Sequence, residues 1–176
     1  MGIYADDMER YEATIEIEEQ ILSVIDQGPA IGAEIRSDGS RFSWIDEGFD
    51  FGSQGIHLAT EGDADQSVSV VLEIDGGLQG PTDDGWALHL DGTAFWPVGS
   101  LQIETADVER VPLAQVEPGR YQVRVWSKGV EQGLAGLEEW RRRLIAWSDT
   151  GRQGPAPTPG PSPETWLVRA VRVGSA

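Results

Sequence analysis

Cysteine is absent from this 176-residue chain, and its absence excludes a whole class of chemistry. Without thiols the sequence can form no disulfide, thiolate metal site or cysteine nucleophile. Long apolar runs are absent too: no stretch reaches 18 residues, so we expect no membrane-spanning helix. The first residues, MGIYADDMERYEA, lack the basic start and apolar core of a secretory signal. These absences together predict a cytoplasmic protein.

Recognisable catalytic motifs are also missing from the sequence. There is no G-x-S-x-G, P-loop, H-E-x-x-H or dinucleotide-binding fingerprint. His57 and His89, the two histidines, are 32 residues apart, and no acidic residue stands near either at metal-ligand spacing. A working site also requires positioned partners, so we interpret them as two unrelated histidines. The prediction is a protein that is not an enzyme and that binds no metal or cofactor.

Basic residues are few, and they are unevenly distributed. The chain has 30 acidic and 13 basic residues, a net charge of −17, and Lys128 is its one lysine. Residues 1–110 carry 24 acids and 4 arginines, a net charge of −20, whereas residues 111–176 carry 6 acids and 9 bases, a net charge of +3. A field of that sign repels nucleic-acid phosphates and attracts basic proteins. Solubility alone is the alternative explanation of the acidity.

The hydrophobic periodicity is mostly that of β-strands. Apolar residues alternate with polar ones over 11–18, 67–74, 86–91 and 121–126, and a last strand is expected over 166–173. Residues 21–25 fit either a strand or a helical turn. The 22 glycines and 10 prolines provide frequent turns between these elements. This spacing predicts an all-β fold, an antiparallel β-sandwich forming a single domain over residues 1–176.

One segment departs from the strand pattern. Leu134, Leu137, Trp140, Leu144 and Ile145 lie near helical spacing, which predicts an amphipathic helix over about 132–147. Five prolines follow within residues 151–163, and they favour an exposed polyproline II connection. We therefore predict an insertion of a helix and a Pro-rich loop at about 127–164. Its arginine cluster, residues 141–143, is expected to be solvated or docked against the acidic half of the chain.

The C-terminal strands resemble a known family. The pattern EPGRYQVRVW at residues 117–126, followed after the insertion by TWLVRAVRV at residues 165–173, is similar to the C-terminal signature of the bacterial competence protein J family. Residues 17–21, 50–58, 66–74, 86–90 and 101–105 occur in a compatible order. The resemblance implies a β-sandwich, and a known relative inhibits a DNA-entry nuclease by binding it. The insertion departs from the family pattern.

These observations favour an acidic binding module, an inhibitor or immunity protein that caps a basic nuclease or toxin. Carboxylates on a β-face can present negative charge to the arginines and lysines with which such an enzyme reads phosphates. The candidate partner-binding residues are Glu12, Glu16, Glu18, Asp46, Glu47 and Asp50. The alternative is a sandwich that binds carbohydrate through tryptophans or calcium through Asp63, Asp65, Asp83 and Asp84.

Overall fold

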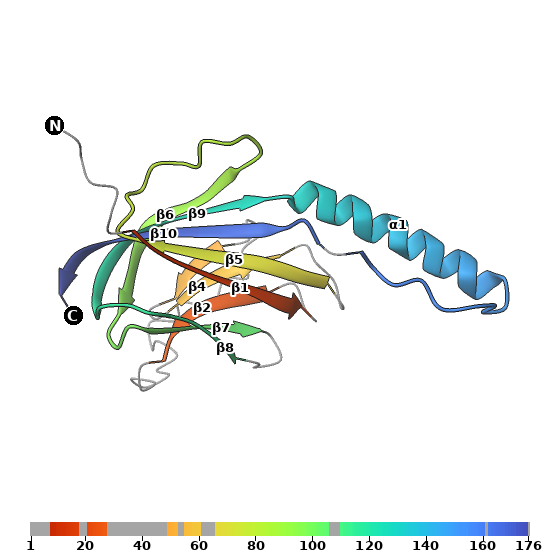
Figure 1. Ribbon diagram of the computed structural model, residues 1–176, viewed down its shortest axis with the longest axis horizontal. Coiled ribbons are helices and arrows are strands. Elements are labelled where there is room, and N and C mark those ends of the chain that lie inside the picture. The colour runs from red at the N-terminus through yellow and green to blue at the C-terminus, as the bar shows by residue number, and fades with distance from the viewer. Residues whose placement is uncertain are drawn as a thin grey trace, which may run out of the picture.

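A computed structural model describes residues 8–17, 21–27, 49–52, 55–60, 66–105, 110–160 and 162–175. Its strands form two sheets of five, and one helix projects beyond their ends (Figure 1). Sheet A has the order β1-β5-β10-β9-β6, with β1 Glu9–Ile17, β5 Gln66–Ile74, β6 Ala87–Trp96, β9 Gly119–Lys128 and β10 Thr165–Ser175. Sheet B has the order β3-β4-β2-β7-β8, with β2 Ile21–Asp26, β3 Phe49–Gly52, β4 Gly55–Ala59, β7 Ser100–Thr105 and β8 Arg110–Gln115.

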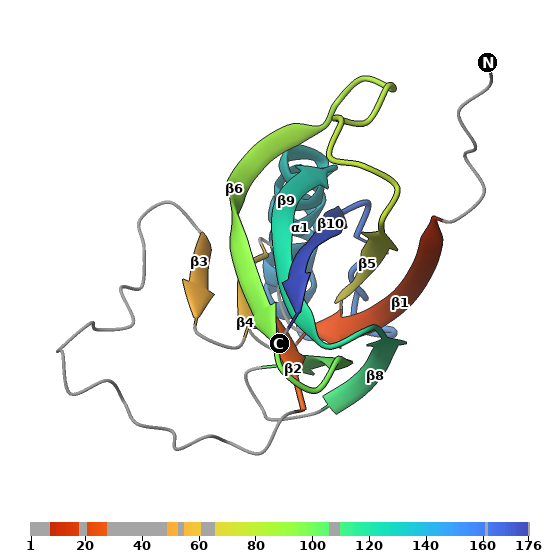
Figure 2. The same ribbon diagram turned by 90° about the vertical axis from the view of Figure 1, so that its left-hand side faces the viewer.

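The predicted all-β sandwich with one helix is confirmed, and the ambiguous segment at 21–25 is strand β2. Figure 2 looks along the strands and shows sheet A as an arc, with the helix directly behind β9 and β10. The prediction of a wholly antiparallel sandwich is wrong at one pairing, because β5 and β10 run parallel from Thr165 opposite Ser69 onward. After the insertion, β10 runs antiparallel to β9. It lies between β9 and β5, and there it pairs with β5 in the parallel direction.

Alternation along the strands builds the core between the two sheets. Tyr121, Val123 and Val125 are all buried, as their alternation with polar neighbours predicts. The Tyr121 ring lies against Trp96, with ring centroids 4.6 Å apart. Its hydroxyl donates to the Glu117 carbonyl at 2.5 Å, closing the Pro-Gly turn that precedes β9. Trp126 lies on the opposite face of β9, in a separate cluster.

Strand β6 contains an irregularity that the sequence did not reveal. The register of β6 against β9 shifts between Leu88 and Leu90, so His89 is an extra residue on β6. The predicted regular alternation from Trp86 to Asp91 is therefore wrong: Leu88 is exposed, whereas Leu90 packs against the core. Because a bulge changes which face each side chain takes, strict alternation fails at this point.

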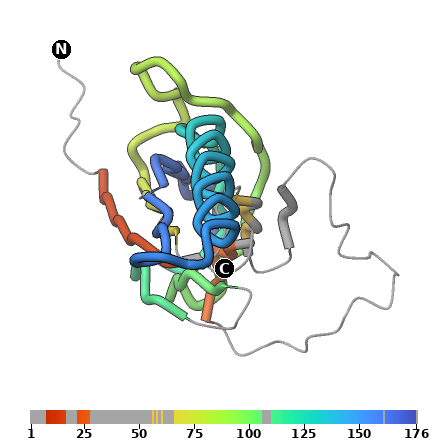
Figure 3. Tube along the Cα trace, turned by 90° about the vertical axis from the view of Figure 1, so that its right-hand side faces the viewer, coloured from red at the N-terminus to blue at the C-terminus, as the bar shows by residue number. Residues whose placement is uncertain are grey.

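The insertion between β9 and β10 is an arm, residues 129–164, that continues the direction of the strands (Figure 1). Helix α1, Val130–Asp149, forms its outgoing half, and residues 150–164 return beside it, as Figure 3 shows. The helix begins after Gly129, whose φ of 82° suits glycine and where a Cβ would lie 2.2 Å from the Pro163 carbonyl oxygen. Trp140 and Trp147 donate their indole N–H groups to the carbonyls of Pro157 and Gly154, at 3.0 and 3.2 Å.

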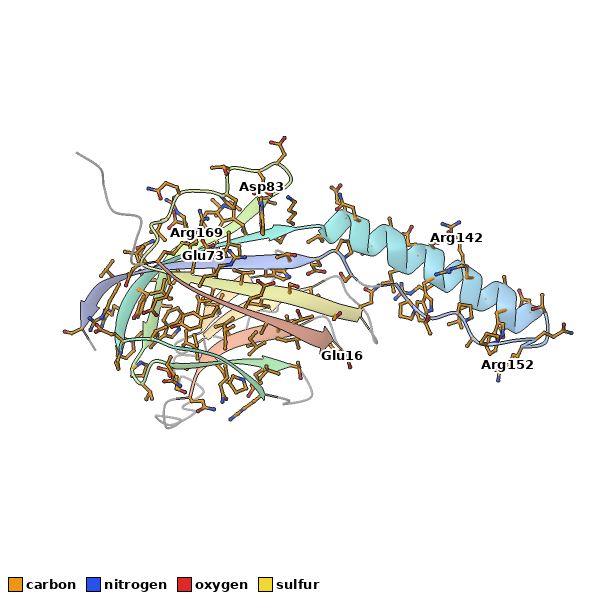
Figure 4. All side chains as sticks on the ribbon, viewed as in Figure 1. Glu16, Glu73, Asp83, Arg142, Arg152 and Arg169 are labelled. Atoms are coloured by element: carbon orange, nitrogen blue, oxygen red, sulfur yellow. The ribbon has the colours of Figure 1, made fainter. Side chains whose placement is uncertain are left out.

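The direction of the arm decides between the two alternatives expected for the arginine cluster, solvation and docking against the acidic half of the chain. Arg142 pairs with Glu139 of the same helix at 2.6 Å, and the helix extends away from the sandwich (Figure 4). The arginine cluster is therefore solvated and does not dock against the acidic half of its own chain. Helix α1 is the one helix among the described residues, and it is not long and apolar enough to cross a membrane.

Candidate functional site: the outer face of sheet A

The outer face of sheet A, the face turned away from the core, carries a row of charged side chains across all five strands. Strand register places Arg10, Glu73, Arg169, Arg124 and Asp91 side by side in this row. Glu73 is its centre. Arg10 Nη1 lies 2.6 Å from Glu73 Oε1, and Arg169 Nε lies 2.7 Å from Glu73 Oε2. Figure 4 labels Glu73 and Arg169 at this point of the sheet. The Glu73 side chain is only 5% exposed, so this carboxylate is stabilised by its two arginines.

At the far end of the row, Asp91 accepts hydrogen bonds from Arg124 Nε and Gln122 Nε2, both at 2.8 Å. These bonds, that from Arg124 first, lower the pKa of Asp91 below its ordinary value. The carboxylate therefore stays ionised and paired within its own sheet. Asp91 and Glu73 thus stabilise the fold and are occupied by their arginines, which makes them poor candidates for holding a partner.

A loop between β5 and β6, residues 75–86, covers part of this face, and we call it the strap. Arg124 Nη1 donates to the Leu78 carbonyl at 2.9 Å, and Arg169 donates to the Gln79 carbonyl. Beneath it, Trp126 is buried with Val71 and Leu167. These contacts close off the central apolar part of the outer face.

The end of the strap is fastened by a lysine. Lys128 Nζ lies 2.5 Å from Asp83 Oδ2, and Trp86 Nε1 donates to Asp83 Oδ1 at 3.0 Å. The bond from Lys128 is the largest cause that lowers the pKa of Asp83. Asp83, a candidate calcium ligand from the sequence, is thus engaged with Lys128 and Trp86. Across the parts of the chain that the structure describes, no three His, Asp or Glu side chains gather as a metal site.

The half of the outer face nearest the arm carries two of the predicted acidic residues. Glu12 and Glu16 are both exposed on β1, and Thr14 between them is exposed as well. The register sets Glu12 opposite Val71, Thr14 opposite Ser69 and Glu16 opposite Ser67. The result is a surface of hydroxyl side chains with two carboxylates along its border, which we call the acidic border. Arg10 Nη2 approaches Glu12 Oε2 at 3.7 Å, a weak contact between exposed groups.

For the four other candidate residues, the structure leaves out either the whole residue or its side chain. Asp50 belongs to β3 at the edge of sheet B, and the structure does not describe its side chain. Glu18, Asp46 and Glu47 lie outside the described residues, as do Asp63 and Asp65. Of the six predicted partner-binding residues, the structure therefore brings together Glu12 and Glu16.

Each of the six tryptophans that the structure describes is buried, packed against a cluster or hydrogen-bonded within the fold. Trp96, Trp126 and Trp166 are buried. Trp140 and Trp147 direct their indole N–H groups into the return segment of the arm. Trp86 packs against the cluster around Trp126 and is half-buried. A sugar-binding site needs an open aromatic face, and these six side chains are committed to packing.

A polar pair, His89 and Ser127, joins two strands at the arm end of the sandwich and was not predicted from the sequence. His89 Nε2 lies 2.6 Å from Ser127 Oγ, and the His89 ring lies 5.3 Å from Trp166. Trp166 Nε1 donates to the buried carboxylate of Glu164 at 2.6 Å. His89 keeps an exposed surface at the edge of the core, and partial burial of its ring lowers its pKa, which favours the neutral ring. Ser127 is buried, so this pair joins β6 to β9 and does not present a nucleophile to solvent. The bulge brings His89 here, and no sequence signal marks it. His57 is in β4, and its side chain is not described.

The molecule is thus a two-sheet β-sandwich with a charged, strapped outer face. A solved structure with this fold is ComJ from Bacillus subtilis, an inhibitor of the DNA-degrading activity of NucA. It aligns with a TM-score of 0.56 and 11% sequence identity over 94% of this chain and 98% of ComJ. The product of crocagin biosynthetic gene J aligns with a TM-score of 0.49 and 13% identity over 94% and 97% of the two chains. No protein-family model and no curated protein matches the sequence.

Proposed function

We propose that this protein is an inhibitor or immunity protein that acts by binding a basic nuclease or toxin, without catalysis of its own. The observation that carries the proposal is the acidic border, where Glu12 and Glu16 point outward from one strand beside a surface of hydroxyl groups. Unlike Glu73, both residues are exposed, and within the described part of the chain the one arginine contact given for them is that of Arg10 with Glu12, at 3.7 Å. They are available to the arginines and lysines of a partner.

The shared fold with ComJ supports a nuclease as the partner class. A net charge of −20 over residues 1–110 would draw a basic enzyme toward this half of the chain and speed its capture. The hydroxyls of Thr14, Ser67 and Ser69 would supply neutral hydrogen bonds between the charged contacts. Binding at this surface would then occlude the phosphate-binding groups of the partner.

The test is inhibition of DNA degradation by a panel of purified basic nucleases. Association rates are measured by stopped flow at several salt concentrations. We expect capture to slow as the Debye length falls from about 30 Å at 10 mM salt to about 8 Å at 150 mM, with less change in dissociation. The double variant Glu12→Lys, Glu16→Lys is expected to lose inhibition while keeping its circular dichroism spectrum.

The matched control is Glu131→Lys, Glu138→Lys, which changes the net charge equally but on exposed positions of the arm. If both double variants weaken inhibition to the same degree, general charge and not the acidic border is responsible. Failure of every basic nuclease to be inhibited, or an association rate indifferent to salt, contradicts the proposal.

A further inference from the structure

The arm is a projection whose helix and return segment are joined by contacts of their own. Leu137 is buried in it, and the indole N–H groups of Trp140 and Trp147 hold the return segment against the helix. At 20 residues, α1 is about 30 Å long. The helix therefore fixes the backbone spacing of its distal arginines before any contact is made, which reduces the entropy lost on binding.

The exposed side of the helix combines apolar and basic side chains. Leu134, Arg141 and Ile145 follow one another at spacings of seven and four residues, so they share one helix face. Both apolar residues are exposed, and Ile145 is 62% exposed. Arg142 lies one turn before Ile145, and its pairing with Glu139 is a contact between two exposed side chains, of the kind that contributes little to stability. That pairing can be exchanged for a partner's carboxylate at little cost.

The charge of the tip is opposite to that of the remaining chain. Residues 141–152, the arm tip, contain four arginines and one acid, a net charge of +3, whereas the other residues total −20. A length of about 30 Å is several Debye lengths at physiological salt, so the acidic sandwich does not neutralise the tip of its own arm. Among the described residues, the acidic border offers a complementary charge on another molecule, with two exposed carboxylates on one strand beside hydroxyl groups.

We propose that the arm tip docks on the acidic border of a second copy of this chain, with Arg142 and its neighbours facing Glu12 and Glu16 and with Ile145 at the centre of the contact. The arm also keeps the two acidic sandwiches apart, where salt screens their repulsion, while the charges in direct contact attract. The contact is heterologous, since tip and border are different surfaces of the chain. It requires no nuclease, so its test is separate from that of the proposed function.

Sedimentation equilibrium of the purified full chain tests the proposal. At about 150 mM salt the average mass is expected to rise above that of one chain with concentration, and at about 1 M salt, where the Debye length is about 3 Å, it is expected to return to that of a single chain. Arg142→Glu is expected to weaken association about tenfold. The matched control Arg120→Glu makes the same charge change at an exposed position of β9 and is expected to leave association unchanged.

A charge-swap experiment decides which surface the tip contacts. Glu12→Arg, Glu16→Arg alone is expected to lose self-association, and mixing it with Arg142→Glu is expected to restore hetero-association through the wild-type tip of the first and the wild-type border of the second. A single-chain mass at all concentrations at 150 mM salt overturns the proposal. So does equal weakening by Arg142→Glu and Arg120→Glu, or a mixture of the two complementary variants that stays unassociated.

Discussion

Glu73 shows how an acidic residue on the outer face is paired within its own sheet and so is not available to a partner. Its carboxylate lies between Arg10 and Arg169 and is nearly buried. Replacing Glu73 by Ala leaves Arg169 without its carboxylate partner, so we expect a loss of about 3 kcal/mol in the free energy of unfolding. Urea denaturation measures it. Glu104→Ala, which removes a more exposed pair with Arg110, is the control and is expected to cost at most about 1 kcal/mol. Equal losses would contradict the role assigned to Glu73.

The two faces of β9 predict opposite sensitivities to truncation. Val123 is fully buried, and Gln122 beside it reaches an exposed contact with Asp91. We expect Val123→Ala to lower the free energy of unfolding by about 1–3 kcal/mol and Gln122→Ala to change it by no more than about 0.5 kcal/mol. Chemical denaturation of both variants provides the measurement. A larger loss at Gln122 would reverse the assignment of the faces.

His89 gives stability a dependence on pH near neutrality. Burial lowers its pKa, so the folded chain favours the neutral ring. As the pH falls below about 6.5, the unfolded chain binds a proton at this position before the folded chain does, and the free energy of unfolding decreases. We expect His89→Gln to lose less stability than the wild type between pH 7.5 and 5.5, measured by urea denaturation. His57 is common to both proteins and cancels in the comparison. Parallel pH profiles would show that His89 does not contribute.

At the scale of elements, the strands with regular alternation could be predicted from the sequence. Residues 121–126 were placed on the correct faces because each apolar side chain enters the core while its neighbour faces outward. The same rule placed Glu12 and Glu16 on the surface. It failed at Leu88, since a bulge depends on pairing with β9 and not on local sequence.

The strap and the buried carboxylate could not be predicted for a related reason. Glu73 alternates outward like Glu12, yet it is buried because residues from other elements cover it. The strap sequence is polar and rich in glycine, and its contacts come from Arg124, Arg169 and Lys128 on distant strands. Tertiary contacts of this kind leave no periodic signal in the sequence, so alternation could identify the acidic border but not its covered neighbour.

We expect the arm to open and be cut independently of the sandwich. We expect limited proteolysis to cut first within residues 151–163, which are mostly exposed, and to leave the sandwich folded. Trp140→Phe removes the indole N–H that binds the Pro157 carbonyl, a hydrogen bond worth about 1 kcal/mol, so cleavage there is expected to be about fivefold faster. The cleavage rate is followed by mass spectrometry. First cleavage within the sandwich, or a Trp140→Phe variant cut no faster, would contradict this description of the arm.

At the scale of the whole molecule, ion pairs join strands on the outer face while many other acids remain in excess. Twelve of the 13 bases are arginines, and several of these are committed to carboxylates on neighbouring strands or in the turn before β9. With 30 acids in the chain, this pairing leaves the molecule with a large unbalanced negative charge. That charge favours encounters with basic proteins, and it also opposes compaction of the chain itself.

The self-repulsion predicts that moderate salt stabilises this protein. Between about 10 and 150 mM NaCl the Debye length falls from about 30 to 8 Å, so repulsion between distant carboxylates is screened, while the close pairs around Glu73 are screened less. If screening raises the free energy of unfolding by about 1 kcal/mol, the midpoint of thermal unfolding rises by about 2–4 °C. Glu12→Gln, Glu16→Gln removes two of the repelling charges and is expected to start from a higher midpoint at 10 mM salt and to gain less from added salt. Thermal unfolding at a concentration low enough to avoid self-association measures both. A midpoint that falls or stays constant with salt would mean that the excess negative charge does not limit the stability of this fold.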